Sequence, residues 1–222
     1  MPPNRKAHSK TRAPRRLHAG LTPEQRHARR RRRILDAGLE IFGTHGYAGS
    51  RINDLCKKAH VTARNFYDHF ASREELLIAI YDEIIADVYA AAVDAMNRSA
   101  DDSLDLVRDG ITAFVKTMAA DERRLRINFV EVVGATTEVE ARRRRAIEMF
   151  RELLASQVRT LEERGLVPRG SNRLTFSALV GAMQESLVDW VDRDDRPPLD
   201  DVIDELVRIF ELTLRLPPPT HS

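Results

Sequence analysis

The chain has 222 residues, of which 42% are hydrophobic and 32% are charged, so it suits one large or two small domains with a buried core and excludes disorder throughout. Its single cysteine, Cys56, excludes an internal disulfide framework and suits a reducing compartment. There is no N-terminal apolar run and no stretch of about 18 apolar residues, so we expect no signal peptide, no membrane span and a cytoplasmic location.

Charge is divided unevenly along the chain, although the formal net charge is only +2. Residues 1–73 hold 17 Lys and Arg against 5 Asp and Glu, whereas residues 74–222 hold 19 against 29. A basic front joined to an acidic body predicts a polyanionic partner for the front part alone.

Residues 1–20 combine Arg, Lys, Pro, Ser and His with almost no apolar side chain, so they cannot bury enough surface to fold and are expected to form a disordered basic arm. Two interpretations stay open for this arm: a solvated tail, or an extension along phosphates or in a minor groove. Residues 217–222 are expected to be a short tail.

The first helix is expected to start at Pro23, because Thr22 is a suitable N-cap, Pro occupies the first helical position and Gln25 completes a capping box. Apolar residues then recur with a 3.6-residue period up to about His45, and Gly46 is a suitable C-cap.

The next segment has the layout of a helix-turn-helix. Ser50 is expected to cap one short helix, 59–61 to form a tight turn, and Thr62 to cap a second short helix. Phe66 and Phe70 would pack back while the polar residues between them face outward. In this layout the first helix braces the second, which enters a major groove of DNA.

Helical patterns continue to the end of the chain. Ser72 and Glu75 form a second capping box and open a helix expected over 73–98, long enough to connect the front rigidly to the rest of the chain. Further helices are expected from about 101, from Asp121 to Gly134, over 172–192 and after Pro198. Another is expected to be capped by Thr137, which forms a capping box with Glu140, and to end before Gly165. The predicted fold is all-α with about nine helices: a helix-turn-helix domain over 21–71, and a helical effector-binding and dimerisation domain over 72–216.

In the last two helices, apolar residues cover a wider arc of the helix surface than a single core can bury. A second buried contact is therefore required. Two such helices from each of two chains would form a four-helix dimer interface. The residues predicted for this interface are Leu179, Met183, Leu187, Val202, Leu206, Ile209 and Phe210.

Methionine and aromatic side chains of the body could line an apolar effector pocket, although the same residues at helical spacing also suit a plain core. The candidates are Phe114, Met118, Phe129, Met149, Phe150, Met183 and Trp190. No ligand spacing for a metal and no cofactor motif is present, so neither a metal nor a cofactor is expected.

The spacing of the predicted helix-turn-helix region resembles the DNA-binding region of the TetR family of transcriptional regulators. The resemblance runs from the apolar first helix, which ends in Phe42 and Gly46-Tyr47, through Val61-Thr62, to Phe66-Tyr67-Asp68-His69-Phe70 and Ser72-Arg73-Glu74-Glu75-Leu76-Leu77. Three departures concern the turn, the start of the fourth helix and the second short helix, where Ala63 and Arg64 occupy positions that vary within such families and so bear on which operator is read. His60 stands where the turn usually has Gly, so it must adopt a left-handed conformation or reshape the turn. Arg73 stands where Lys is usual and can still hold a phosphate.

The resemblance implies that Thr62, Tyr67, His69 and Arg73 hold the DNA backbone. Arg and Asn side chains can read guanine and adenine by paired hydrogen bonds, which makes Arg64 and Asn65 the candidates for base contacts. The full predicted DNA-binding set is Ser50, Arg51, Thr62, Ala63, Arg64, Asn65, Tyr67, His69 and Arg73.

The predicted function is a dimeric regulator of transcription that binds a near-palindromic, double-stranded operator, most simply a repressor released by a small-molecule effector. Two alternatives are a helical interaction protein and an enzyme using Glu131 or Glu185. Neither a phosphate-binding loop nor a nucleophile motif supports an enzyme, and the histidines lie outside the body, so no catalytic residue is predicted.

Overall fold

The computed structural model describes residues 22–99 and 104–216, so the expected basic arm and the C-terminal tail lie outside the described residues. Within these residues every regular element is a helix, as the all-α prediction requires. The elements are α1 (Pro23–His45), α2 (Ile52–Ala59), α3 (Ala63–Tyr67), α4 (Arg73–Arg98), α5 (Asp105–Ala119), α6 (Glu122–Arg126), the π-helix η1 (Ile127–Glu131), α7 (Thr137–Glu163), α8 (Arg173–Asp192) and α9 (Leu199–Arg215).

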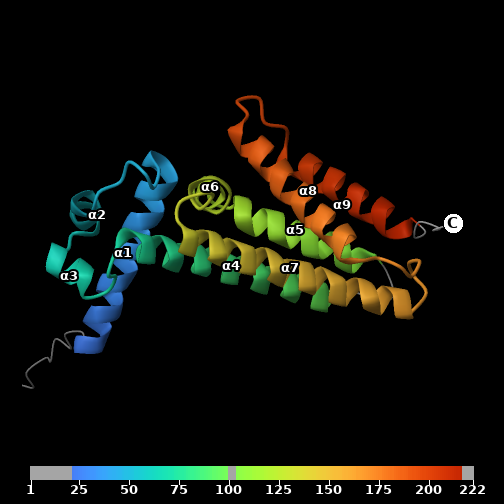
Figure 1. The fold of residues 1–222 in the computed structure, drawn as a ribbon, viewed down its shortest axis with the longest axis horizontal. Helices are drawn as coiled ribbons and strands as arrows, with labels where there is room; N and C mark the ends of the chain where they lie inside the picture. Colours follow the sequence, from blue (N-terminus) through green and yellow to red (C-terminus); the bar gives the residue numbers. More distant parts are fainter. Residues whose placement is uncertain (1–21, 100–103, 217–222) are drawn as a thin grey trace, which may run out of the picture.

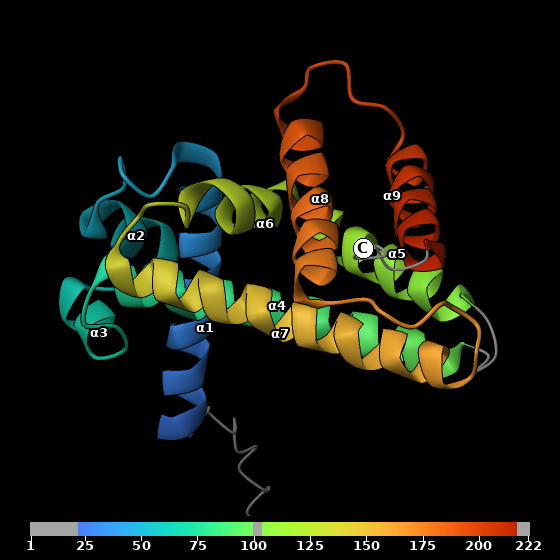
Figure 2. The same ribbon diagram turned by 45° about the vertical axis from the view of Figure 1, so that its right-hand side comes forward.

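Helices α1, α2 and α3 form a small group at one end of the molecule, which we call the head (Figure 1). Helix α4 leaves the head and runs through the rest of the molecule, the body, alongside α5 and α7 (Figures 1 and 2). Helices α8 and α9 lie next to each other on the body, and the short α6 lies where head and body meet. The long α4 therefore connects the two parts.

Local capping explains where the main helices start. Thr22 and Gln25 form the expected capping box of α1. The Ser72 hydroxyl accepts a hydrogen bond from Glu75 N at 3.1 Å, and the Glu75 carboxylate accepts one from Ala71 N at 2.5 Å, so Glu75 reaches one residue further back than a standard box. These bonds satisfy amide groups that the first helical turn leaves unpaired.

Two expected caps differ from the structure. Arg51, not Ser50, is the N-cap of α2, and its side chain makes no capping bond. Helix α7 is capped by Thr136, whose hydroxyl accepts a hydrogen bond from Val139 N, one residue before the expected Thr137. A threonine pair offers two equivalent hydroxyls, so local sequence does not distinguish the two registers.

The segment 121–134 is expected from its sequence to be one continuous helix, and it is divided instead. Asp121 caps α6 as expected, but the chain changes at Ile127 into a π-helix. The wider turn is closed by the amide of Val132, which donates to Ile127 O at 3.2 Å. Such short π segments are often found at functional sites.

One hydrophobic core extends from the head into the body without interruption. In the head it contains Ile34, Phe42, Leu55 and Phe66, all with no exposed surface. Across the described residues, no helix combines the length and apolar character needed to cross a membrane.

Candidate DNA-binding surface and ligand cavity

The turn between α2 and α3 is made by His60, the residue that replaces the usual glycine. Its φ is 51° and its ψ is 49°, which is the left-handed region. The expected left-handed conformation is therefore present and the turn keeps its shape. His tolerates this region better than β-branched residues, and Arg33 donates a hydrogen bond to the His60 carbonyl oxygen.

Helix α3 presents several predicted DNA-binding residues to solvent. The Thr62 hydroxyl accepts a hydrogen bond from Asn65 N at 3.2 Å, which fixes the start of the helix. Ala63 and Arg64 are exposed, and Tyr67 is 55% exposed although it is a large aromatic residue. Phe66 is fully buried and its ring contacts that of Tyr67 edge to face. One face of α3 therefore anchors the helix while the other stays available for a ligand.

Ser50 and Arg73 are turned toward each other inside the head. The Arg73 Nη1 donates to the carbonyl oxygens of Tyr47 and Ser50 and, at 2.9 Å, to the Ser50 hydroxyl. The Arg73 guanidinium also lies 5.0 Å from the centre of the Tyr47 ring. Ser50 is only 6% exposed and its hydroxyl is bound by Arg73, so in this conformation its side chain is not presented to a ligand. Arg51 beside it is exposed.

His69 is packed against α1. Both of its ring nitrogens are buried without a hydrogen-bond partner among the described residues, and its ring centre lies 4.0 Å from that of His27. Burial lowers the pKa of His69, and the nearby His27 and Arg30 lower it further, so a neutral imidazole is favoured. The expected contact of His69 with a phosphate is not possible in this conformation.

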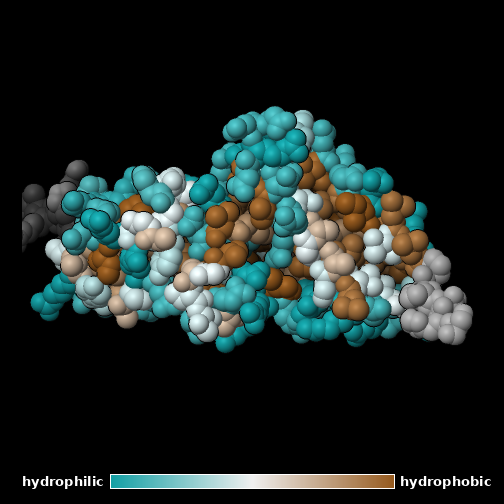
Figure 3. Space-filling model, turned by 45° about the horizontal axis from the view of Figure 1, so that its top comes forward, coloured by the Kyte–Doolittle hydropathy of each residue, from teal (hydrophilic) through white to brown (hydrophobic). Residues whose placement is uncertain are grey.

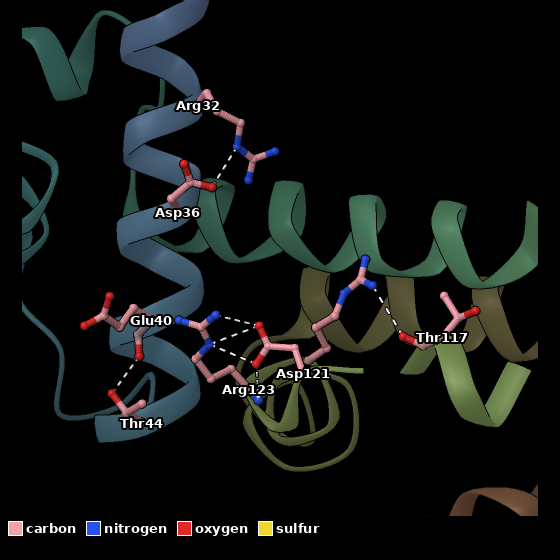
Figure 4. A network of polar contacts seen from close by, with 8 residues as sticks. Arg32, Asp36, Glu40, Thr44, Thr117, Asp121 and Arg123 are labelled. Carbon is pink, nitrogen blue, oxygen red and sulfur yellow. Dashed lines mark hydrogen bonds and ion pairs between the residues drawn. The ribbon is translucent and has the colours of Figure 1, made fainter. Parts of the chain in front are cut away.

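Helix α6 joins the body to the head at Gly43 of α1. A Cβ atom on Gly43 would lie 2.4 Å from the Cβ of Arg123, so only glycine allows this close approach. The Arg123 side chain binds the Asp121 carboxylate, with Nε 2.9 Å from Oδ1 and Nη2 2.6 Å from Oδ2, and lies beside Glu40 of α1 (Figure 4). These hydrogen bonds hold the pKa of Asp121 below its usual value.

The π-helix makes a second connection to the head. The amide of Tyr47 donates a hydrogen bond of 2.7 Å to the carboxylate of Glu131, which also lies 3.6 Å from Arg126. The loop that leads into α2 is therefore held by a residue of the body. Glu131, a candidate catalytic carboxylate in the enzyme alternative, is engaged in this contact.

An apolar cavity of about 40 Å³ lies within the body. It is bounded by side chains of α4, α5, α7, α8 and α9, and every residue around it is apolar. The lining residues are Ala92, Met96, Val107, Gly110, Ile111, Phe114, Phe150, Leu153, Leu154, Val180, Met183 and Phe210.

A second cavity, of about 20 Å³, lies next to the first and shares Phe114, Phe150, Val180 and Met183 with it. Unlike the first, it has polar side chains in its wall, from α4, the π-helix, α7 and α8. These are Tyr81, Asn128, Arg143 and Gln184. The apolar cavity thus has a neighbour whose wall is partly polar, which we call its polar end.

The predicted pocket residues divide into two groups. Phe114, Phe129, Phe150 and Met183 line the cavities, while Met118, Met149 and Trp190 line neither. Met118 is fully buried in the core, and Trp190 donates a hydrogen bond from Nε1 to the Pro197 oxygen beside a separate groove. The polar members Asn128, Arg143 and Gln184 were missed, because a search for methionine and aromatic residues does not find them, and the aromatic Tyr81 was missed as well.

Most residues predicted for the dimer interface are already used within the chain. Leu179, Met183, Leu187, Leu206 and Phe210 are at most 6% exposed, so they cannot supply the surface of a second contact. Met183 and Phe210 line the apolar cavity instead. Helix α9 packs on α5, and α8 on α7, which buries these side chains.

Val202 and Ile209 remain partly exposed, and with the exposed Leu212 and Leu216 they form an apolar row along α9. Apolar residues gather on the part of the surface that carries α8 and α9, whereas the head is mostly hydrophilic (Figure 3). The groove beside Trp190 opens between these two helices and is also lined by Val202.

Comparison with known proteins agrees with the geometry of the head. Residues 34–80 match the family model described as "Bacterial regulatory proteins, tetR family". The chain is 21% identical over 166 residues to the fatty acid metabolism regulator protein of Bacillus subtilis, covering 73% of this chain and 84% of that protein. It is 40% identical over 52 residues to the A-factor receptor protein of Streptomyces griseus, covering 23% of this chain and 19% of the receptor.

Solved structures share the fold of most of the chain. The regulator FadR of Bacillus subtilis, solved in complex with stearoyl-CoA, has a TM-score of 0.74 at 19% identity, covering 82% of this chain and 97% of FadR. The head therefore has the helix-turn-helix of the matched family model, and the relative from Bacillus subtilis is a regulator protein. Over residues 34–80 the chain carries the region that the TetR family model describes, and the relatives that it matches over most of its length include regulators of transcription.

Proposed function

We propose that this regulator is a dimeric repressor that binds a near-palindromic operator through α3 and leaves it when a mainly apolar effector occupies the body. The observation that carries the proposal is the position of the π-helix. Asn128 and Phe129 line the polar end of the cavity, while Glu131, three residues beyond Asn128, holds the amide of Tyr47. One short segment thus contacts both the ligand space and the head.

Release by a ligand is the expected consequence of this arrangement. A molecule that fills the small second cavity must displace side chains of its wall, because protein interiors are close-packed. Displacement of Asn128 or Phe129 would move the π-helix and weaken the contact between Glu131 and Tyr47. The head would then change its position relative to the body, and the two recognition helices of a dimer would lose the spacing that successive major grooves require.

The proposed dimer uses the apolar row of α9 together with the outer face of α8. Val202, Ile209, Leu212 and Leu216 follow the three- and four-residue intervals of a helix–helix seam, and the charged Glu205, which pairs with Arg208, holds the one position between Val202 and Ile209. Neighbouring α8 exposes Leu174, Ala178 and Gly181, and the space around Gly181 is open. Small residues allow a partner helix to approach closely, so a second copy fits this face.

The effector is proposed to be mainly apolar because all side chains around the larger cavity are apolar. The fold shared with FadR, which was solved with stearoyl-CoA, supports a ligand with an acyl-like chain. Met96 and Met183 are unbranched and flexible, so their rotation can enlarge the space for a longer molecule.

Two measurements on the full chain test the proposed DNA binding. Sedimentation velocity should give a dimer, and fluorescence anisotropy with an arbitrary duplex of about 30 base pairs should show binding at low salt. Affinity should fall by on the order of a thousandfold or more between 50 and 200 mM salt, since about six or more phosphates are contacted. A monomer at working concentration, or duplex binding that is insensitive to salt, would refute the proposal.

A further inference from the structure

The polar end of the cavity contains an unsatisfied group. Asn128 is 7% exposed, and its side-chain oxygen Oδ1 has no hydrogen-bond partner among the described residues. Leaving such an oxygen unpaired costs about 1–3 kcal/mol. The oxygen belongs to a residue that lines the second cavity, and a ligand there could supply the missing bond.

The charged side chain of this cavity, Arg143, is already bound to a carboxylate. Arg143 donates two hydrogen bonds of 2.9 Å to Glu140, which also accepts one from the exposed Arg144, and the two arginines hold the pKa of Glu140 at about 2. Burial raises the pKa of Tyr81, so its hydroxyl stays neutral. Gln184 is neutral at every pH. An anionic group placed here would have to compete with Glu140 for Arg143, whereas a neutral polar group would meet the neutral Asn128, Tyr81 and Gln184.

We propose that Asn128 determines ligand specificity by hydrogen bonding to a neutral hydroxyl group on an otherwise apolar effector. A hydroxyl both donates and accepts, so it pairs with the amide in either orientation of that side chain. The apolar part of the molecule would extend past Phe114 and Phe150, whose rings lie 5.1 Å apart, into the larger cavity. This inference rests on the proposed effector function, because it concerns the ligand of the same site.

Matched probes test the inference by isothermal titration calorimetry on the full chain without DNA. The probes are 1-octanol, its isomer 1-methoxyheptane, which has the same atoms but no O–H donor, and octanoate, which is anionic. We expect 1-octanol to bind about three- to tenfold more tightly than the other two, the size of one neutral hydrogen bond. Failure of 1-octanol to bind, or equal or tighter binding of either other probe, would overturn the inference.

Two variants separate a role in ligand binding from a structural one. Asn128→Leu has a similar size and should abolish the preference for 1-octanol over 1-methoxyheptane, while raising the melting temperature of the ligand-free protein because an unpaired buried oxygen is removed. Gln184→Met removes the partly exposed amide of the same cavity and should keep the preference. A lower melting temperature of Asn128→Leu with an unchanged preference would show that Asn128 is structural.

The outcome for DNA binding is read separately by anisotropy with the same duplex. If 1-octanol is preferred but leaves the affinity for DNA unchanged, Asn128 is the specificity residue and effector release is refuted. If the duplex is released by probes without any preference for the hydroxyl, release stands and the role of Asn128 is refuted.

Discussion

The exposed side of α3 contains residues of two kinds, and their chemistry predicts different roles. Arg64 carries a forked set of donors that can pair with two acceptors on a guanine edge, whereas Tyr67 offers one hydroxyl suited to a phosphate. Both are exposed, and both stand on a helix anchored by the buried Phe66. Ser50, which is buried, and His69, whose ring nitrogens are buried, illustrate the opposite case, in which a polar residue of the head serves its internal packing.

We expect Arg64→Ala to reduce affinity for a specific site by about 1–3 kcal/mol and to relax the preference at one base pair, with little change on random duplex. Tyr67→Phe removes only the hydroxyl and should weaken binding to both kinds of DNA alike. Anisotropy titrations with specific and random duplexes distinguish the two effects. Equal losses on both duplexes for Arg64→Ala would exclude it from base recognition.

The turn residue His60 allows a stability test. Its left-handed backbone favours glycine and strongly disfavours a β-branched residue. His60→Gly should raise the free energy of unfolding by about 0.5–1 kcal/mol, and His60→Val should lower it by about 1–2 kcal/mol. Chemical denaturation measures both. If the two substitutions have equal effects, the turn is not left-handed in solution.

Among the elements, those with strong local signals were predicted most accurately. The bounds of α1 and α4 agree with the sequence, because Thr22 and Ser72 cap the first turns and the apolar period is unbroken. The π-helix was not predictable in this way. Its wider turn occurs where Asn128 and Phe129 line the cavity and Glu131 binds the head. These are tertiary contacts, which local sequence patterns do not reveal.

The ion pair of α6 predicts a dependence of stability on pH. Asp121→Asn keeps an N-cap acceptor but removes the ion pair with Arg123. We therefore expect the free energy of unfolding to fall by about 0.2–1 kcal/mol at pH 7. The pKa of Asp121 is lowered in the folded state, so its contribution is present above its ordinary pKa and is lost as pH falls through the lowered value. Denaturation at several pH values should show the difference between the two proteins shrinking below about pH 4. A difference that is constant from pH 7 to pH 2 would contradict this.

The contact of the π-helix with the head is testable by hydrogen exchange. Glu131→Ala removes the acceptor of the Tyr47 amide, a charge-assisted bond worth about 1.5–3 kcal/mol, so exchange at this amide should accelerate about tenfold or more. Glu138→Ala removes an exposed carboxylate of nearby α7 and serves as the control. Unchanged exchange in Glu131→Ala would show that the body does not hold this loop.

At the scale of the whole molecule, the sequence predicted the organisation better than the sites. A basic front, a long connecting helix and wide apolar arcs were sufficient for an all-α regulator, and they are what the structure contains. The residues within each arc could not be divided between core and interface, because periodicity identifies the apolar side of a helix but not which partner covers it. Leu206 and Ile209 lie on the same helix, yet only Leu206 is buried in the core.

The proposed dimer predicts that Leu212→Asp disrupts self-association. Leu212 is 54% exposed in the single chain, so the change should cost the fold little while placing a charge in the proposed seam. Val133→Asp is a matched control, because Val133 is 56% exposed and lies outside α8 and α9. Sedimentation velocity should give a monomer for Leu212→Asp and a dimer for Val133→Asp. If both variants sediment as dimers, the interface does not include Leu212.

DNA binding by two heads of a dimer is the central claim, and in vitro selection from a random duplex pool tests it most directly. The selected sequences should contain two inverted half-sites whose centres lie about 10–10.5 base pairs, or a multiple of this, apart. Enrichment of single half-sites, of direct repeats, or of no sequence at all would contradict the account.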